Sequence, residues 1–264
     1  MTSRAPHLVL LVCVLFTTQA WSNVVVYPTT GLNLTAIPGA PTSASLQFKP
    51  DESQLDPVKY RLASFRVNGV DVDKSKLMVN NLYLDKPRTL DRFQLILSGK
   101  ERSNPVTSIF KFQPTWTDIP GNYSGYLTSD GETPDIPIKV AVKPKSVLAL
   151  TPKNFKIRTS NFNTPSVQTV DVVFGSNSPG WELYLSASDL TKFNGSVLGK
   201  DKIYVRVKGN PKSSWVKLDQ IVKIAAGGSN APSKIATLEF LVDADKLEKA
   251  GDYLGSVKFL IKSI

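Results

Sequence analysis

The residue types that most often do chemistry are scarce in this chain. It contains one histidine, His7, and one cysteine, Cys13, and both lie in an N-terminal stretch with the features of a cleaved signal peptide. Without that stretch no imidazole and no thiol remain. Their absence excludes a Ser-His-Asp triad, a cysteine nucleophile, Cys/His metal sites and any disulfide.

The remaining catalytic options are weak. A glycosidase needs two carboxylates facing each other across a cleft, and the candidates by residue type mostly adjoin turns: Asp51, Glu52, Asp118, Glu182, Asp243 and Asp245. Ser146, Ser186 and Ser188 have no Ser-x-x-Lys context, and we find no glycine-rich phosphate loop and no calcium loop of the EF-hand type. We therefore expect a non-enzyme with no cofactor and no metal site.

Residues 1–22 have the pattern of a secretory signal peptide. Arg4 precedes an unbroken apolar run from Leu8 to Phe16, and Ala20-Trp21-Ser22 supplies small residues around a cleavage site. The run is too short to span a bilayer, which takes about 20 residues, and no later segment is longer. We expect an exported protein of the periplasm, cell surface or extracellular space, with no transmembrane anchor.

The chain is basic, with a formal net charge of +10 at pH 7. The charges are dispersed, and many alternate with apolar residues, as in the stretch from Lys202 to Lys208. This pattern is typical of the solvent face of a strand. We expect no nucleic-acid partner; attraction to anionic surface glycans is the functional alternative.

The elements that must position any site are short strands. Runs of alternating apolar residues rich in Val, Ile, Phe and Tyr are separated by Gly, Pro, Asn and Ser, and helix-period patterns are hard to find. Many short strands without intervening helices indicate a sandwich or barrel. The predicted class is all-β.

An internal repeat divides the chain. The string Gly-x-Tyr-x-Gly occurs at Gly121, Tyr123 and Gly125 and again at Gly251, Tyr253 and Gly255. Two copies one domain apart predict two β-sandwich domains, residues 23–142 and 146–264, joined by a linker at 143–145. At each copy we expect a structural corner, in which the tyrosine packs on the core and its hydroxyl bonds to loop backbone. The second glycine would allow another chain segment to approach closely.

These two strings, Pro120 to Gly125 and Ala250 to Gly255, resemble the signature before the last strand of bacterial immunoglobulin-like surface and fimbrial domains. The resemblance implies two tandem immunoglobulin-like β-sandwich domains following the cleaved signal peptide.

Two further groups are candidates for binding. Trp116, Trp181 and Trp215 could stack on a carbohydrate, although Trp181 also fits a core position on a central strand. The apolar strand Val24, Val25, Val26 and Tyr27, directly after the cleavage site, could be exchanged onto the sheet edge of a neighbouring molecule, or could pair within its own domain.

The leading functional hypothesis is an exported, non-catalytic structural or adhesive protein of a bacterial envelope or surface appendage. Its expected partners are proteins bound by strand addition, or anionic surface glycans. The alternatives are a periplasmic pilus-assembly chaperone, a carbohydrate-binding protein and, last, a glycosidase.

Overall fold

The computed structural model describes residues 24–54, 56–101, 103–131, 133–157, 167–209, 214–243 and 252–264. The expected signal peptide therefore lies outside the described residues. Regular structure in the described part is strand, apart from two single-turn 3-10 helices, η1 (Lys74–Lys76) and η2 (Lys200–Lys202). This confirms the all-β prediction. No helix in this part has the length and hydropathy needed to cross a lipid bilayer.

The N-terminal half, residues 24–142, is a sandwich of two sheets. The first sheet has the strand order β1 (Val24–Tyr27), β3 (Thr42–Pro50), β9 (Val106–Phe112), β6 (Leu77–Asn80) and β7 (Arg88–Thr89). The second has the order β2 (Leu32–Ala36), β11 (Ile136–Val142), β10 (Gly121–Ser129), β4 (Val58–Val67) and β5 (Val70–Asp71), with β8 (Gln94–Leu97) also pairing β4. β11 runs antiparallel to β10 and parallel to β2, so it is hydrogen-bonded on both sides.

The C-terminal half, residues 146–264, has a second sandwich with fewer strands on one face. One sheet has the order β12 (Ser146–Thr151), β13 (Val167–Ser176), β20 (Asn230–Val242), β17 (Ile203–Val207) and β18 (Val216–Lys217). The facing sheet has β19 (Val222–Gly227), β14 (Trp181–Ala187) and β21 (Val257–Ser263), and β15 (Leu190–Thr191) pairs with β16 (Val197–Leu198). Both halves are immunoglobulin-like β-sandwiches.

The strands form where side chains alternate between core and solvent. In β9, Val106, Phe110 and Phe112 are buried while Thr107 and Ile109 are exposed. Each half has its own apolar core. In the N-terminal half Phe65, Phe112 and Tyr123 pack together, and in the C-terminal half Phe174 lies 4.5 Å from Trp181, centroid to centroid.

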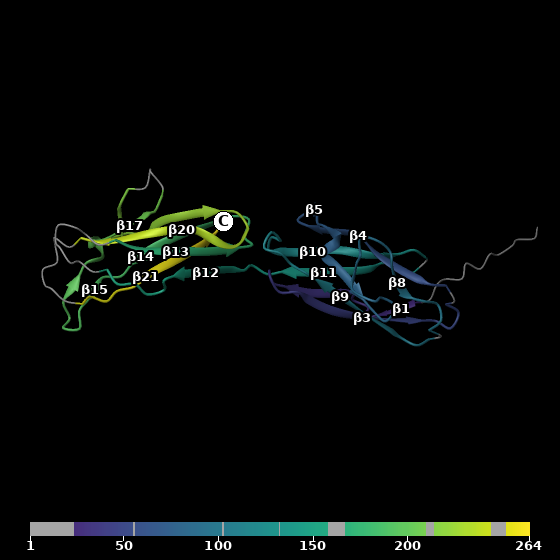
Figure 1. The fold of residues 1–264 in the computed structure, drawn as a ribbon. Helices are drawn as coiled ribbons and strands as arrows, with labels where there is room; N and C mark the ends of the chain where they lie inside the picture. The colour runs from purple at the N-terminus through teal and green to yellow at the C-terminus, as the bar shows by residue number, and fades with distance from the viewer. Residues whose placement is uncertain are drawn as a thin grey trace, which may run out of the picture.

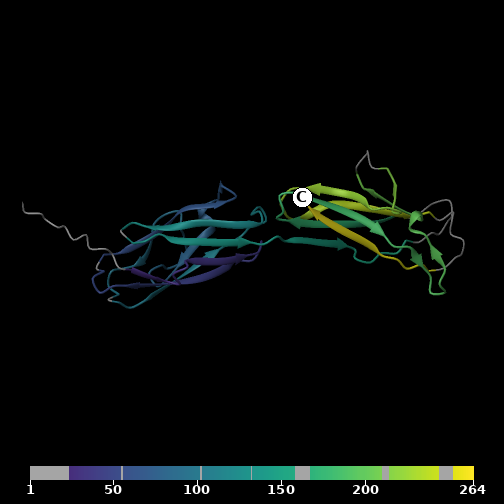
Figure 2. The same cartoon turned by 180° about the vertical axis from the view of Figure 1, so that it is seen from behind.

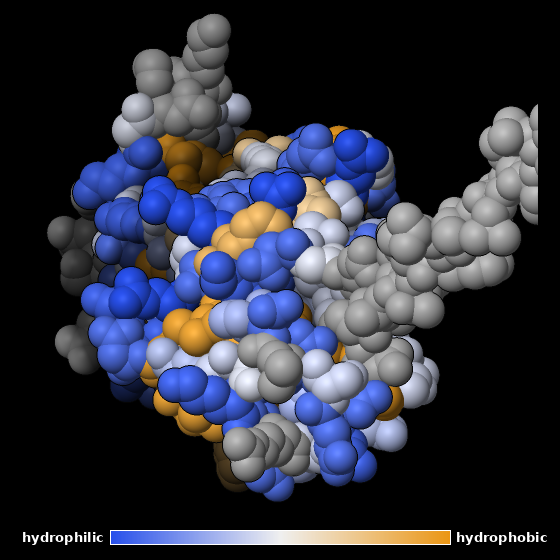
Figure 3. Space-filling model, turned by 90° about the vertical axis from the view of Figure 1, so that its right-hand side faces the viewer, coloured by the Kyte–Doolittle hydropathy of each residue, from blue (hydrophilic) through white to orange (hydrophobic). Residues whose placement is uncertain are grey.

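The two halves lie end to end, with the chain passing from β11 into β12 at the joint between them (Figures 1 and 2). The end of the N-terminal half that is turned away from the joint presents mainly hydrophilic side chains, with smaller apolar areas between them (Figure 3).

Candidate functional site

In the part of the C-terminal half that the structure describes, one side of the sandwich has no covering strand. β18 and β19 are edge strands joined only by residues 218–221, so the edges they form lie together on one side of the sandwich. The opposite edges, β12 and β21, therefore lie together on the other side (Figure 2). No strand of the described residues pairs with the outer edge of either. We call the side bounded by β12 and β21 the open side.

The backbone of β21 faces the open side at every second residue. The N–H of Ser188 donates to the carbonyl of Ser256 over 2.9 Å, and the N–H of Ile264 donates to that of Gly180 over 2.9 Å. In an antiparallel ladder alternate residues direct both backbone groups to the same neighbour. The even-numbered residues therefore pair with β14, and Val257, Phe259, Ile261 and Ser263 direct N–H and C=O groups to the open side.

β12 presents its backbone in the same way. The N–H of Asn177 donates to the carbonyl of Lys145 over 3.2 Å, in the register of the antiparallel β12–β13 pair. Residues 147, 149 and 151 therefore pair with β13, and Ser146, Leu148 and Leu150 direct their backbone groups outward. Two strands thus direct backbone groups to the same space, and these groups have no backbone partner among the described residues.

The side chains of these residues leave apolar surface partly exposed. Leu148 and Leu150 on β12, and Val257, Phe259 and Ile261 on β21, pack against the core but are only half-buried. On β10, the strand of the N-terminal half that β11 covers, Tyr123 and Leu127 are at most 1% exposed. The open side is therefore an incompletely covered core bordered by strand edges.

The outer face beside the open side is basic. Lys258, Leu260 and Lys262 are the outward residues of β21, and all three are exposed. On β14, Glu182 forms a close ion pair with Lys223, while the Nζ of Lys262 lies farther from it, at 3.9 Å.

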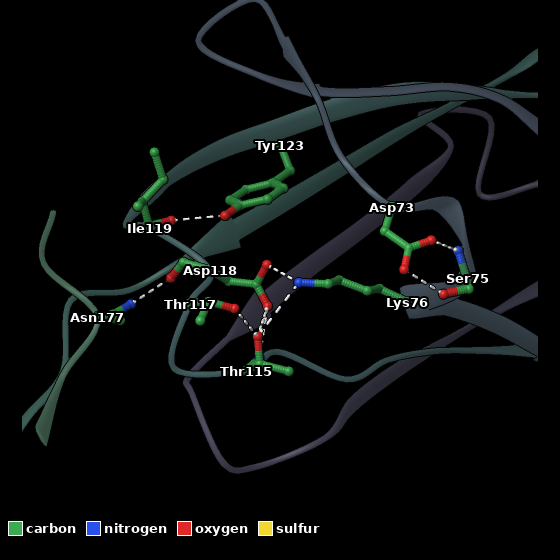
Figure 4. Close-up of polar contacts among 9 residues, drawn as sticks. All are labelled: Asp73, Ser75, Lys76, Thr115, Thr117, Asp118, Ile119, Tyr123 and Asn177. Carbon is green, nitrogen blue, oxygen red and sulfur yellow. Dashed lines mark hydrogen bonds and ion pairs between the residues drawn. The ribbon is translucent and has the colours of Figure 1, made fainter. Parts of the chain in front are cut away.

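A buried asparagine joins the two halves. The Nδ2 of Asn177, a fully buried residue, donates to the carbonyl oxygen of Asp118 over 3.0 Å (Figure 4) and to that of Lys143 over 3.1 Å. Its Oδ1 accepts from the N–H of Lys145 over 2.7 Å. These contacts use both amide hydrogens and the amide oxygen, and they connect β13 to the loop before β10.

The Asp118 carboxylate organises the N-terminal side of the joint. It is 4% exposed, forms an ion pair with Lys76, and accepts from the N–H (2.7 Å) and hydroxyl (2.9 Å) of Thr115 (Figure 4). Lys145 strengthens the same joint: its Nζ donates to the carbonyl of Pro38 over 2.9 Å and lies 5.2 Å from the ring centroid of Trp116. These contacts resist bending between the halves.

The corner predicted in the N-terminal half is present. The Tyr123 side chain is 1% exposed, and its hydroxyl donates to the carbonyl of Ile119 over 3.0 Å (Figure 4). Burial, with a smaller contribution from the charge of Asp118, raises the pKa of Tyr123 to about 12. Gly121 opens β10, and at Gly125 a Cβ would lie 2.0 Å from the carbonyl oxygen of Ser64, so the close approach requires glycine there.

The corner predicted in the C-terminal half differs from that at Tyr123 in its position relative to the strand, and its hydroxyl bond stays a prediction. Tyr253 is half-buried and precedes β21, and its ring lies 4.6 Å from the Nζ of Lys192. Gly255 is exposed, and a Cβ there would meet the end of the Leu190 side chain, which can move. Gly251 lies outside the described residues. The reason is that β21 begins only at Val257, so the tyrosine does not open a strand over the core.

The three tryptophans do not form one binding surface. Trp181 is 4% exposed, packs on Phe174, and donates its indole N–H to the carbonyl of Gly228 over 2.6 Å. It is a core residue, so the stacking prediction is wrong for it. Trp116 is half-buried beside Lys145, and Trp215, in the other half, is half-buried beneath Arg206.

The segment Val24, Val25, Val26 and Tyr27 pairs within its own half. It forms β1, in which Val24 lies opposite Pro50 and Tyr27 opposite Gln47 of β3, and Val24 is 5% exposed. This is the arrangement expected from the alternative of intramolecular pairing. Its exchange onto another molecule stays a prediction; the open backbone edge lies on β12 and β21 instead.

The described residues offer little for catalysis or metal binding. No group of three or more His, Cys, Asp or Glu side chains lies close enough together there to hold a metal ion. Among the carboxylates suggested by residue type, Asp118 forms an ion pair with Lys76 and Glu182 with Lys223, while Asp245 lies outside the described residues. A groove of about 280 Å³ lies on the outer face of β3, β9 and β6, where the Oδ1 of Asn80 is buried without a partner among the described residues.

The chain matches no family model and no curated protein. Among solved structures it is similar to a complex of the chaperone CsuC with the tip adhesion subunit CsuE from archaic chaperone-usher pili of Acinetobacter baumannii, with 10% identity and a TM-score of 0.42 over 91% of this chain and 100% of that one. It is also similar to tandem immunoglobulin domains of titin, with 10% identity and a TM-score of 0.25 over 92% of this chain and 95% of that one.

A family 123 glycoside hydrolase from Clostridium perfringens matches 46% of this chain and 26% of its own, with 11% identity and a TM-score of 0.32. Similarities this low give no basis for assigning a function, which must come from the geometry of the chain itself.

Sequence reasoning missed both the open side and the joint. Asn177, Ser178, Pro179 and Gly180 have the composition of an ordinary turn, and nothing in the string marks Asn177 as buried. The apolar alternation in β21 is the same whether or not a neighbouring strand is present. The open side is recognised only when the strand edges of the two halves are compared in the structure.

Proposed function

We propose that this chain is an exported, non-catalytic structural subunit of a bacterial surface appendage, and that its C-terminal half accepts a β-strand from another subunit between β12 and β21. The observation that carries the proposal is the open side. There, backbone groups of two strands that have no backbone partner among the described residues border half-buried side chains, among them Leu148, Phe259 and Ile261. Addition of a strand to such an edge is an established mode of protein recognition.

The β10–β11 pair of the N-terminal half supplies the template for the β21 side of the completed arrangement. β12, unlike β2, belongs to the facing sheet. In the N-terminal half β11 runs antiparallel to β10 and parallel to β2, and its residues Ile138 and Val140 are at most 1% exposed. A strand in the open side would run antiparallel to β21 and parallel to β12. Each apolar side chain that it buries would contribute roughly 1.5–3 kcal/mol, in addition to the backbone hydrogen bonds.

The division into domains at residues 23–142 and 146–264, with the linker between them, belongs to the same proposal. Strand pairing and core packing are consistent with it, because each half has its own sheets and its own apolar cluster. The joint at Asn177 suits a subunit that transmits force along an appendage, since its hydrogen bonds resist bending between the halves.

The chaperone alternative requires a strand that can be donated. β11 is hydrogen-bonded on both sides and β1 is paired with β3, whereas β12 and β21 offer acceptor edges. This asymmetry favours the role of an acceptor subunit over that of a strand-donating chaperone.

A peptide-binding experiment tests the proposal. The full chain is mixed with a nine-residue peptide of alternating Val and Thr, and the thermal unfolding midpoint is recorded. We expect the peptide to stabilise the chain; at a concentration of one hundred times Kd the gain is about 2.7 kcal/mol. A peptide of the same composition in scrambled order is the control.

Two variants locate the binding site. Phe259→Asp places a charge in the open side and should abolish the stabilisation. Leu260→Asp changes the neighbouring residue on the outer face, which is 56% exposed, and should retain it. Circular dichroism verifies that each variant is folded. Equal loss in both variants, or no stabilisation of the unaltered chain, would overturn the proposal.

A further inference from the structure

The strip of surface that an added strand would border is positively charged on the β21 side. Lys258 lies opposite Ser186 of β14, so no carboxylate faces it across that pair. Lys262 lies opposite Glu182, but Lys223 already pairs closely with that carboxylate. β21 has no acidic residue of its own. Two lysines therefore border the position that the outward side chains of an added strand would occupy.

The β12 side adds no negative charge. The side chains on the solvent face of β12 are those of Val147, Ala149 and Thr151, and the strand has no acidic residue. Since β12 leads away from the joint and β21 returns toward it, the end of β12 lies at the same end of the half as Lys258. Two further exposed lysines, Lys153 and Lys156, follow β12 there. The lysines of the outer rim therefore lie on β21 and beyond the end of β12, while β12 itself is uncharged.

We propose that the strand accepted between β12 and β21 carries acidic side chains at its outward positions, and that it comes from a different, acidic protein rather than from a second copy of this chain. The inference rests on the proposed strand-accepting function and adds the chemistry of the partner. Residues directly opposite each other on one face of an antiparallel pair interact, and opposite charges there stabilise the pairing.

The pattern required of the partner follows from the register. Alternate residues face inward and are apolar, so that they cover Val257, Phe259 and Ile261. The residues between them face outward, and those opposite Lys258 and Lys262 are Asp or Glu.

This chain is a poor source of such a strand. β11 has the right length and alternation, but it carries the exposed Lys139 at an outward position and is already paired on both sides. The β1 segment has no acidic residue. The net charge of +10 also opposes association of two copies at this rim.

Three peptides test the inference. All share inward valines and one soluble Gly-Ser tag, and their outward residues are Glu, Thr or Lys. Affinity for the full chain is measured by fluorescence anisotropy at low and high salt. We expect the Glu peptide to bind about fivefold or more tightly than the Thr peptide, and the Lys peptide to bind most weakly. The differences should shrink as salt rises.

A charge-reversal pair assigns the effect to the rim. Lys258→Glu with Lys262→Glu should reverse the order of the Glu and Lys peptides. Lys49→Glu with Lys139→Glu, which makes the same change of net charge on the N-terminal half, should leave the order intact.

The outcomes separate this inference from the proposed function. If all three peptides bind equally and salt has no effect, the acidic partner is refuted while strand acceptance stands. If the order persists in the Lys258/Lys262 double variant, the rim does not select the partner. If no peptide binds, the proposed function itself fails.

Discussion

Tyr123 on β10 lies directly opposite Val140 on β11, and both side chains are almost completely buried, at 1% and 0% exposure. Phe259 on β21 lies opposite Leu185 of β14 on one side, and its other side has no strand partner among the described residues. The β10 edge is therefore covered by a strand, and the β21 edge is not covered by any strand of the described residues; this difference is the basis of the proposed function.

The two tyrosines of the repeat should differ sharply in their effect on stability. Tyr123→Ala removes a buried aromatic ring and should cost about 3–5 kcal/mol. Tyr123→Phe removes only the hydrogen bond to Ile119 and should cost about 1 kcal/mol. Tyr253→Ala, at a half-buried position outside any strand, should cost less than about 1 kcal/mol. Chemical denaturation measures all three, and equal losses of stability at Tyr123 and Tyr253 would contradict the expected difference between the two positions.

The contrast shows what sequence could predict here. The Gly-x-Tyr-x-Gly string is local, but a corner also needs the tyrosine to open a strand over the core. At Tyr123 it does so, because β10 begins at Gly121; at Tyr253 the strand begins only at Val257. Alternation sufficed for the all-β class because it reflects one buried face. Alternation could not reveal the open side, because it does not show which strands pair with one another along their edges.

The joint should loosen when Asn177 loses its amide. Asn177→Ala leaves the carbonyls of Asp118 and Lys143 and the N–H of Lys145 without their partner, at a cost of about 1–3 kcal/mol. Small-angle X-ray scattering should then show a wider range of distances between the halves. Asn194→Ala, at an exposed turn of the C-terminal half, should change neither quantity. An unchanged scattering profile for Asn177→Ala would show that other contacts hold the joint.

Acid should weaken the N-terminal half through Glu101. Burial opposes ionisation of this carboxylate, but hydrogen bonds from Ser98 and Tyr83 outweigh it and lower the pKa of Glu101 from 4.5 to about 2. A carboxylate with a lowered pKa in the folded state stabilises the fold above its ordinary pKa. That contribution is lost as the pH falls from about 4.5 to about 2.

Glu101→Gln should therefore lower stability at neutral pH and flatten the dependence in that window. Thermal unfolding of both proteins between pH 2 and 7 measures the difference. Parallel curves would show that Glu101 does not contribute to the acid sensitivity.

The most direct test of strand acceptance is residue-resolved hydrogen exchange of the full chain along β21, with and without the Glu peptide. The amides of Lys258, Leu260 and Lys262 pair with β14 and should be protected in both samples. The amides of Val257, Phe259 and Ile261 face the open side; they should exchange rapidly in the chain alone and become protected when the peptide binds. Uniform protection of β21 without peptide, or no gain at these three amides with it, would contradict the proposed function.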